Sequence, residues 1–299
     1  MTEVEAFAYY LKHERALSEN SIQAYVSDLN KLDQYSKNQL NVSKLSELER
    51  SDLSQFLYAH GEFLSPRSLS RLISSIKSFY SFLHFNLSIE KNPSQHLQNP
   101  KFSSKPPVFL SIEEVDGIIG AVPPNDKHLY RNQAIIELLY SCGLRVSELC
   151  QLALNRVFME EDFIQIIGKG NKERLVPLSR ALKNRLEVYF SIEREGLSSK
   201  KSCSPHVFLN NRGCGLSRIM VFNIVKKYAQ LAGLSPRISP HSFRHSFASH
   251  MIENGADLRI VQDLLGHESI QTTELYTHLN QSFVKKEFLE KHPRNSQKA

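Results

Sequence analysis

The sequence predicts a mainly α-helical protein of two domains, with one small antiparallel β-sheet in the C-terminal domain. Three observations lead to this fold class. The 299 residues are enough for two domains, a stretch rich in proline and serine interrupts the chain near residue 100, and helical periodicity dominates except at one hairpin-like pair of apolar runs. The composition, 41% hydrophobic and 23% charged, is that of an ordinary globular protein and excludes disordered and fibrous classes.

The N-terminal domain is expected over residues 1–98, where helical periodicity occurs in the segments 2–14, 18–36, 46–60 and 65–85. The last segment is the clearest, because Ser65 can cap the helix and Pro66 suits its first turn. Its buried stripe is predicted to be Leu69, Leu72, Ile73, Ile76, Tyr80 and Leu83. The opposite face carries basic and hydroxyl groups suited to phosphate contact or to solvent alone: Arg67, Arg71, Ser74 and Ser78.

A linker is predicted over residues 99–107, which hold three prolines, two serines and two lysines. The C-terminal domain follows at 108–299. Two strand-like runs, 163–167 and 175–178, flank the turn Gly168–Glu173, whose two glycines are typical of a hairpin. Helices are expected around this hairpin over 111–120, 130–142, 145–152, 180–193, 217–232, 242–254, 257–265, 269–279 and 281–290.

The positive charge of the chain is concentrated in its second part. The net charge is +6, but the first 100 residues hold 10 Lys/Arg against 11 Asp/Glu, whereas residues 101–299 hold 27 against 20. A basic surface favours a polyanionic partner. The main anion-binding site is therefore expected in the C-terminal domain.

No secretion, membrane or metal signal is found in the sequence. It lacks an apolar run of membrane-spanning length, and acidic residues occupy the start of the chain where a signal peptide is basic, so a cytoplasmic location is expected. The cysteines show no CxxC spacing and are expected to be reduced packing residues: Cys142, Cys150, Cys203 and Cys214. The segment HSFRH lacks the glutamate of a zinc-protease motif, and no metal site is predicted.

Reactive polar groups are dense between residues 237 and 279. His241 and Arg244 lie one helical turn apart at a helix start, where unpaired backbone N–H groups favour an anion. Gly266 is predicted to end a helix, with His267 at the exposed turn that follows, and Tyr276 stands further on. Singly, each of these residues is more typical of packing or a surface contact than of catalysis.

Upstream, Arg145 and Glu148 lie three residues apart on a predicted helix, so the carboxylate can hold the guanidinium. The segments GLRVSEL, IGKGNKERLVPL, HSFRHSFASHM and LLGHESIQTTELYTH together resemble, in order, the tyrosine recombinase (lambda-integrase type) family. The resemblance covers essentially the whole chain and implies the family's two-domain architecture, a helical core-binding domain followed by an integrase-like catalytic domain. Its implied catalytic residues are Arg145, Lys169, His241, Arg244, His267 and Tyr276.

This resemblance implies cutting and rejoining of DNA through a 3′-phosphotyrosine formed by Tyr276, without metal or nucleotide cofactor. Arg145 and Arg244 would hold the non-bridging oxygens, a role that suits planar, permanently ionised guanidinium groups. His267 is assigned a hydrogen bond to the same phosphate, and His241 a phosphate contact or removal of the tyrosine proton. Lys169 would protonate the departing 5′-oxygen.

Within the family, the chain is most similar to the bacterial Xer recombinases. NGADLR, KKYAQLAGL and the ending KHPR resemble the XerD branch more than the XerC branch. The implied partners are a double-stranded DNA site at the chromosome terminus, a second Xer recombinase in a (hetero)tetramer and a septal DNA translocase, and the implied task is resolution of chromosome dimers. Residues 281–291 carry more apolar side chains than a frayed terminus needs, which indicates packing within the chain. The family resemblance implies instead that this C-terminal segment docks on a neighbouring protomer.

Three alternative functions follow from the same residues. A phage or transposon integrase would use the same chemistry with a different partner and target site. A type IB topoisomerase would share the tyrosine nucleophile but would relax supercoils without a recognition site. A non-catalytic DNA-binding protein would not require the six candidate residues.

Overall fold

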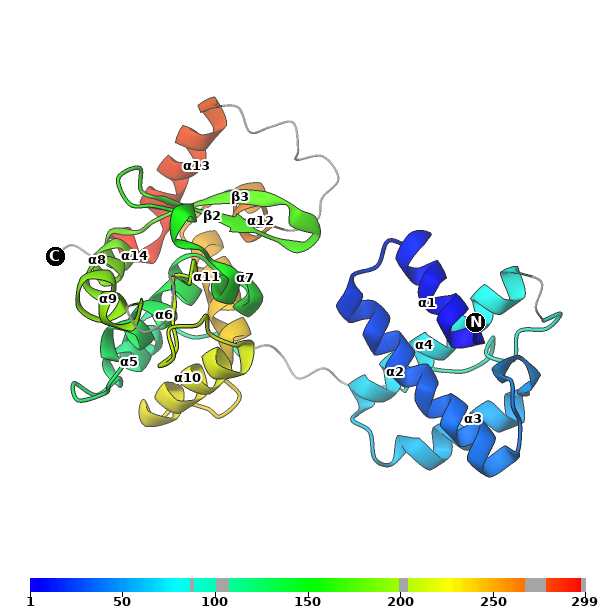
Figure 1. The fold of residues 1–299 in the computed structure, drawn as a ribbon. Helices are drawn as coiled ribbons and strands as arrows, with labels where there is room; N and C mark the ends of the chain where they lie inside the picture. The colour runs from blue at the N-terminus through cyan, green and yellow to red at the C-terminus, as the bar shows by residue number, and fades with distance from the viewer. Residues whose placement is uncertain (87–88, 101–107, 199–203, 267–277, 297–299) are drawn as a thin grey trace. The chain divides into compact units, whose positions relative to one another are not determined.

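The structure, a computed structural model, describes residues 1–86, 89–100, 108–198, 204–266 and 278–296. The chain divides into two compact units, Met1–Lys105 and Pro106–Ala299 (Figure 1). Each unit has its own cluster of buried apolar side chains. Each is therefore described by itself.

The first unit is helical throughout its regular structure. Its elements are α1 (Glu3–His13), α2 (Glu19–Tyr35), the π-helical turn η1 (Ser36–Leu40), the 3₁₀ turn η2 (Leu45–Glu47), α3 (Arg50–Gly61) and α4 (Pro66–Phe85). Hydroxyl caps fix where the helices begin: Thr2, Ser18 and Ser65 each accept a hydrogen bond from a first-turn N–H. Pro66 occupies the first turn of α4, as predicted.

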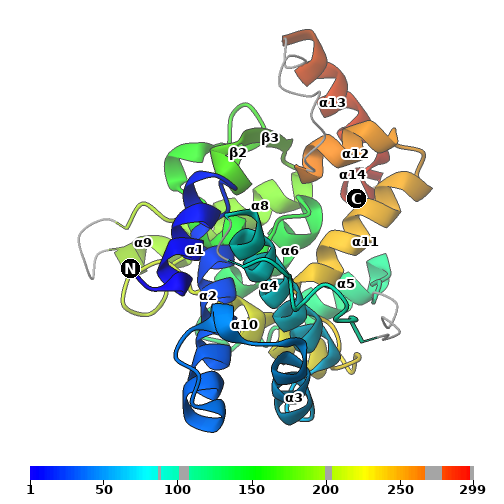
Figure 2. The ribbon, with the colours of Figure 1, turned by 90° about the vertical axis from the view of Figure 1, so that its right-hand side faces the viewer.

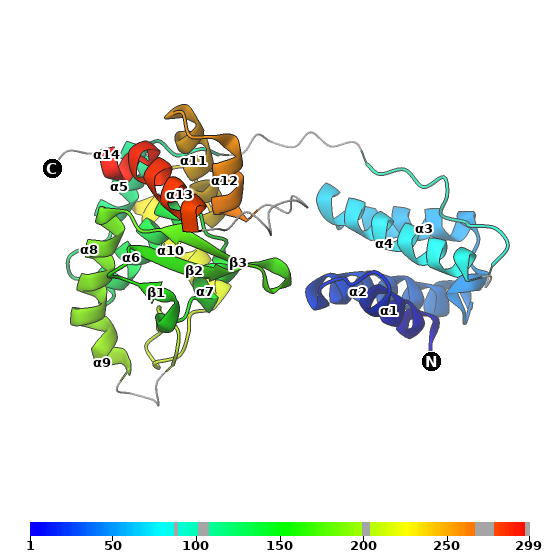
Figure 3. The ribbon, with the colours of Figure 1, turned by 90° about the horizontal axis from the view of Figure 1, so that it is seen from above.

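The core of this unit lies between two layers, α1 with α2 and α3 with α4 (Figure 3). The stripe predicted for α4 is buried at Leu72, Ile73, Ile76, Tyr80 and Leu83, whereas Leu69 is half-buried. Tyr80 donates a hydrogen bond of 2.7 Å to the carbonyl of Leu45. Burial raises the pKa of the Tyr80 hydroxyl. Through its bond to Leu45, this hydroxyl joins α4 to η2.

The second unit is helical around a small sheet. Its helices are α5 (Ile112–Gly120), α6 (Leu129–Ser141), α7 (Val146–Gln151), α8 (Arg180–Val188), α9 (Glu195–Ser198), α10 (Arg218–Leu231), α11 (Pro240–Glu253), α12 (Leu258–Leu265), α13 (His278–Lys291) and α14 (Pro293–Ser296). Shorter turns are η3 (Leu154–Arg156), η4 (Lys169–Asn171) and the π-helical η5 (Tyr189–Arg194). The predicted helix 180–193 is thus a shorter α-helix continued by a π-helical turn. The predicted helix 269–279 lies almost entirely outside the described residues.

The sheet is antiparallel in the order β1 (Val157–Phe158), β2 (Phe163–Ile167) and β3 (Glu173–Pro177). The mainly helical fold with a small antiparallel sheet is confirmed. The strand β3 begins two residues earlier than predicted, because Glu173 and Arg174 pair with the last two residues of β2. The two-residue strand β1 was not predicted, since it is too short to show alternation.

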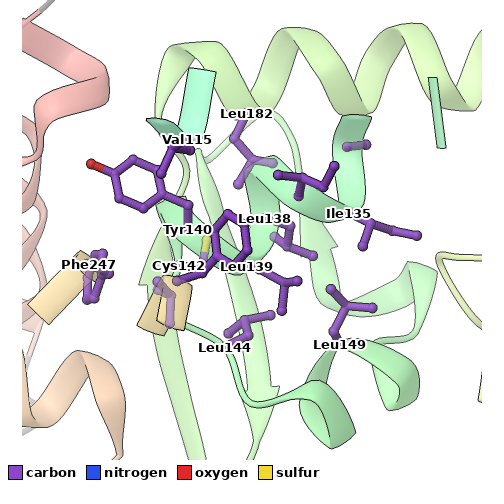
Figure 4. Packing of buried hydrophobic residues seen from close by; sticks show 14 of the residues in the cluster. Val115, Ile135, Leu138, Leu139, Tyr140, Cys142, Leu144, Leu149, Leu182 and Phe247 are labelled. Atoms are coloured by element: carbon purple, nitrogen blue, oxygen red, sulfur yellow. The ribbon is translucent and has the colours of Figure 1, made fainter. Parts of the chain in front are cut away.

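The core of the second unit surrounds α6, which is buried along most of its length (Figure 4). Leu138, Leu139 and Tyr140 pack there with Leu182 of α8 and Phe247 of α11 (Figure 4). Helices α11 and α12 lie side by side at this core (Figure 2). The core thereby holds in place the ends of α6 and α12, where the candidate site is found.

Other sequence expectations can be compared with the described part of the chain. Among the described residues, we find no helix with the length and hydrophobicity that a membrane span requires. Cys142 is buried, Cys150 is half-buried and Cys214 is exposed, all with free thiols. The prediction of a packing role is therefore wrong for Cys214, whose place in an exposed loop was not evident from composition; Cys203 lies outside the described residues.

Candidate active site

The buried carboxylate of Glu148 on α7 organises the candidate site. Its Oε2 accepts the backbone N–H of Arg145 at 2.8 Å, and its Oε1 accepts Nη1 of the Arg145 side chain, also at 2.8 Å. The sequence spacing of three residues makes this possible, because Arg145 caps the helix that carries Glu148. The Glu148 side chain is 4% exposed and that of Arg145 is 36% exposed, so a buried carboxylate binds a guanidinium that remains partly exposed.

A second arginine reaches the same place from α11. Arg244 donates from Nη1 to the carbonyl of Gly143 at 2.8 Å and from Nη2 to the carbonyl of Leu265 at 2.6 Å, and Nη1 lies 4.0 Å from Glu148. Burial, followed by the positive charge of Arg145, lowers the pKa of Arg244 to about 10. Arg244 is therefore still a cation near neutral pH.

The side chains of Phe247 and Leu265 pack closely against Gly143, whose carbonyl Arg244 binds. Gly143 has a φ of +57°, and a Cβ there would lie 2.6 Å from Phe247 and 2.8 Å from Leu265. A side chain at this position would meet two packed neighbours and also strain the backbone. The sequence therefore needs glycine where α6 ends beside α11 and α12.

The two guanidinium groups meet at the end of α12. Arg145 Nη1 donates to the Leu265 carbonyl at 3.5 Å, the same oxygen that accepts Arg244, and Arg145 Nη2 donates to the Gly266 carbonyl at 3.4 Å. Gly266 adopts the left-handed conformation with φ of +65°, as predicted for the end of this helix. Two cations thus lie together at the point where the chain leaves α12 toward His267.

The other predicted catalytic residues are described only in part. His241 is exposed on the first turn of α11, one turn before Arg244. The backbone of Lys169 lies in η4, inside the hairpin turn closed by a 2.7 Å hydrogen bond from Gly168 N–H to the Lys172 carbonyl. His267 and Tyr276 lie outside the described residues, as does the side chain of Lys169. Among the described candidates, the structure brings Arg145 and Arg244 together.

The sequence analysis missed Arg174 of β3. Its side chain is 5% exposed, and it donates from Nη1 and Nη2 to the two carboxylate oxygens of Glu148 at 3.0 and 2.8 Å. Burial alone would raise the pKa of Glu148, but Arg174, followed by Arg145, holds that pKa below its ordinary value. The available signal was strand alternation, because Arg174 shares its strand face with the buried Val176.

Comparisons with known proteins show which family the chain belongs to. The model described as "Phage integrase family" matches residues 109–282, and that described as "Phage integrase, N-terminal SAM-like domain" matches residues 4–85. The chain belongs to the phage integrase family. Tyrosine recombinase XerD of Oceanobacillus iheyensis is 40% identical over 292 residues, which are 97% of this chain and 98% of that protein. Tyrosine recombinase XerD of Staphylococcus saprophyticus is 39% identical over 294 residues, covering 98% and 99%.

Solved structures share the fold of this chain. XerH recombinase bound to a palindromic difH substrate gives a TM-score of 0.70 at 24% identity, over 95% of this chain and 83% of that chain. A lambda integrase dimer bound to a core site gives a TM-score of 0.69 at 16% identity, over 89% of this chain and 94% of that chain. The predicted resemblance to the tyrosine recombinases, and within them to the XerD branch, is confirmed. The chain is a site-specific DNA recombinase of the tyrosine type.

The predicted phosphate-contact face of the recombinase lies on α4, in the first unit. Arg67 is exposed, and Arg71, with a side chain 51% exposed, donates to the buried Asp28 of α2 at 2.9 Å. Ser74 donates to the Ser70 carbonyl, and Ser78 is half-buried. The face has no acid of its own, but α2 supplies one to Arg71. Arg67 is therefore the more freely presented cation.

The C-terminal tail of the recombinase packs on its own unit. Phe288 is buried in the core and Val284 is half-buried against it, whereas Phe283 is 53% and Leu289 39% exposed. Arg294 of α14 forms ion pairs with Glu137 of α6 and Asp116 of α5. Packing within the chain, one of the two interpretations of this tail, thus accounts for Phe288 and leaves two apolar side chains at the surface.

The same tail predicts a pH dependence of stability. His292 is fully buried, and burial, followed by the charges of Arg294 and His250, lowers its pKa from 6.5 to about 3. Between these pH values the unfolded chain binds a proton that the folded chain excludes. The stabilisation is therefore complete above pH 6.5 and is lost as the pH falls toward 3. In urea unfolding across this window, we expect His292→Gln to show a shallower fall in unfolding free energy than the unmodified chain.

The control for His292→Gln is His245→Gln, because His245 is exposed on α11 in the same unit. In this control, the unfolding free energy should fall with pH as steeply as in the unmodified chain. An unchanged slope in His292→Gln would contradict the assignment of this pH dependence to the buried ring.

Proposed function

We propose that Tyr276 attacks a DNA phosphodiester while Arg145 and Arg244 bind its non-bridging oxygens. The observation that carries this proposal is the convergence of both guanidinium groups on the Leu265 carbonyl, at 3.5 and 2.6 Å. Charge builds up on those oxygens in the five-coordinate state, and preorganised cations stabilise it without rearranging. The Tyr276 oxygen bonds to phosphorus, the bond from phosphorus to the 5′-oxygen breaks, and that oxygen takes up a proton.

The product keeps one phosphoester for every one broken. A second 5′-hydroxyl can attack the 3′-phosphotyrosine, reseal the strand and release Tyr276 without ATP. Trapping on a nicked suicide substrate, followed by mass spectrometry of the DNA-linked peptide, tests the proposal. Linkage at Tyr276 is expected, and linkage at any other residue would overturn the assignment of the nucleophile.

The two histidines and the hairpin lysine complete the proposed site. His241, on the first turn of α11, contacts the phosphate or assists in removing the tyrosine proton, and His267 donates to the same phosphate. Lys169 protonates the departing 5′-oxygen from its hairpin turn. The position of the Lys169 backbone in η4, between β2 and β3, supports this assignment.

A sulfur substitution separates proton donation by Lys169 from phosphate binding. We expect Lys169→Ala to cleave ordinary DNA very slowly but to recover on DNA whose scissile 5′-oxygen is sulfur, because a thiolate leaves without a proton. The measurement is single-turnover formation of the covalent adduct on both substrates. Arg145→Ala should not recover, since its loss removes charge stabilisation. Equal failure of Lys169→Ala on both substrates would refute the acid role, and recovery of Lys172→Ala would transfer it to that residue.

We further propose that both units bind the recombination site, with the α4 face on the phosphate backbone. The exposure of Arg67 supports this, as do the descriptions of XerH bound to difH and lambda integrase bound to a core site. Arg67→Ala is expected to weaken binding at all sequences and to reduce the salt slope by about one counterion. Fluorescence anisotropy over a salt series measures both.

The control for this prediction is Lys37→Ala, which removes an equal charge from the same unit but from a side chain already paired with Asp33 at 2.8 Å. It should leave the salt slope nearly unchanged. Equal slopes for Arg67→Ala and the unmodified chain would remove Arg67 from the contact.

The biological role is proposed from the relatives. We propose that the recombinase resolves chromosome dimers in the cytoplasm at a terminus site, in a tetramer with a second recombinase and under control of a septal DNA translocase. The XerD relatives support this role, and the exposed Phe283 and Leu289 of α13 offer an apolar contact to a neighbouring protomer. A phage or transposon integrase is the alternative.

A plasmid carrying two copies of the host terminus site tests the role. Resolution that requires both this chain and a partner recombinase is the expected result. Resolution by this chain alone would refute the partner requirement, and no exchange at terminus sites despite exchange at an element end would favour the integrase.

A further inference from the structure

Arg174 is a buried guanidinium whose donors are directed inward. Its Nη1 and Nη2 hold both oxygens of Glu148, and its Nε donates to the carbonyl of Leu264 at 2.7 Å. The residue is 6% exposed. The planar fork of arginine suits this bidentate arrangement together with a third, sideways bond, and a lysine ammonium does not. With these donors directed to protein acceptors, Arg174 does not face the DNA as Arg145 does.

Two glycine positions show that Arg174 also touches the turns on both sides of the site. A Cβ at Gly266 would lie 3.1 Å from Arg174 Nη1 and 3.3 Å from its Cδ, so the end of α12 rests directly on this side chain. A Cβ at Gly168 would lie 3.6 Å from the same Nη1 and 3.9 Å from Glu148 Oε1. The start of the hairpin turn that carries Lys169 therefore also lies against the Arg174–Glu148 pair.

The charges in this cluster give Arg174 a second effect. Three arginines surround Glu148: Arg174 binds both of its oxygens, Arg145 makes one side-chain bond, and Nη1 of Arg244 lies 4.0 Å away. Without Arg174, Arg145 would be the arginine still hydrogen-bonded to the buried carboxylate, since the Arg244 donors are held by the Gly143 and Leu265 carbonyls, and Glu148 would draw the Arg145 guanidinium inward. Arg174 therefore keeps Glu148 occupied and leaves Arg145 partly exposed, where a phosphate can reach it.

We propose that Arg174 is a positioning residue of the recombinase, which holds the Arg145 guanidinium in place between Glu148 and the end of α12. This inference rests on the proposed function, in which Arg145 and Arg244 bind the scissile phosphate. Arg174 itself does not touch the DNA. Its effect reaches the reaction through Arg145, which Glu148 and the carbonyls of Leu265 and Gly266 hold.

The test uses Arg174→Lys in the full chain, with thermal unfolding to establish folding at the assay temperature. Lysine keeps the charge but cannot bind both oxygens of Glu148 and the Leu264 carbonyl together. We expect DNA affinity within about threefold of the unmodified chain and single-turnover cleavage slower by about 10- to 100-fold, the cost of a small misplacement at a reaction centre. The matched control is Arg185→Lys, because Arg185 also pairs with a buried glutamate, Glu137, at 3.5 Å. It should cleave at the unmodified rate.

A double-mutant cycle with Arg145→Ala distinguishes positioning from general destabilisation. If Arg174 acts through Arg145, adding Arg174→Lys to Arg145→Ala should slow cleavage by less than about twofold further, because the group it positions is already gone. Additive losses, or unmodified cleavage by Arg174→Lys, would overturn the inference. Unmodified cleavage by Arg145→Ala alone would instead overturn the proposed function. If Arg174→Lys does not fold, Arg174→Gln enters the same cycle with the same expected outcomes.

Discussion

Tyr276→Phe is expected to bind the recombination site with nearly unchanged affinity and to form no covalent adduct. The substitution removes one oxygen, the proposed nucleophile, and leaves the cations at Arg145 and Arg244 in place. Because those cations are proposed to bind phosphate in the ground state as well as in the reaction, DNA affinity should survive the loss of chemistry. The measurements are electrophoretic mobility shift for binding and denaturing gels of a nicked suicide substrate for the adduct.

Two other tyrosines of the second unit serve as controls. Tyr228 is buried and donates to Asp126 at 2.6 Å, and Tyr189 is buried and donates to the Val207 carbonyl at 3.2 Å. Burial raises the pKa of both hydroxyls, which makes them poorer sources of phenolate. Their phenylalanine variants should still form adduct wherever they fold. Normal adduct yield in Tyr276→Phe would show that the nucleophile is another residue.

The parts of this fold that could be predicted are those with a local cause. Helix α4 was foreseen because Ser65, Pro66 and an apolar stripe at helical spacing are all contained in one segment. The end of α12 was foreseen because glycine favours the left-handed conformation found at Gly266. The contact of Arg145 with Glu148 follows from a spacing of three residues.

The parts that could not be predicted depend on contacts between distant segments. Arg174 stands 26 positions from Glu148 in the sequence, and nothing local to β3 says which carboxylate it binds. The meeting of Arg145 and Arg244 at Leu265 needs the packing of α6, α11 and α12 around Gly143. The family resemblance named both arginines but could not say that backbone carbonyls hold them.

Arg145→Ala and Arg244→Ala are expected to lose activity alike but stability unequally. Each removes a preorganised cation from the proposed phosphate site and should raise the barrier by about 3–4 kcal/mol, so single-turnover cleavage should fall roughly a hundredfold or more in both. The difference lies in what each guanidinium does for the fold. Arg145 is partly exposed, and without it Glu148 keeps both bonds from Arg174. Its removal should cost about 1 kcal/mol of unfolding free energy or less.

Arg244 is buried, and its removal takes the donor from the Gly143 carbonyl and leaves the Leu265 carbonyl with the longer 3.5 Å bond from Arg145, so the link between the end of α6 and the end of α12 is lost. One buried acceptor that loses its partner and a second that keeps a long bond together cost roughly 2 kcal/mol, so Arg244→Ala should unfold at a lower urea concentration than Arg145→Ala. Urea unfolding measured beside cleavage gives both quantities for each variant. Equal stability of the two variants would show that Arg244 does not brace the helix ends. Near-normal cleavage by either variant would remove that residue from the proposed phosphate site, because the loss of a cation that contacts the scissile phosphate must slow cleavage.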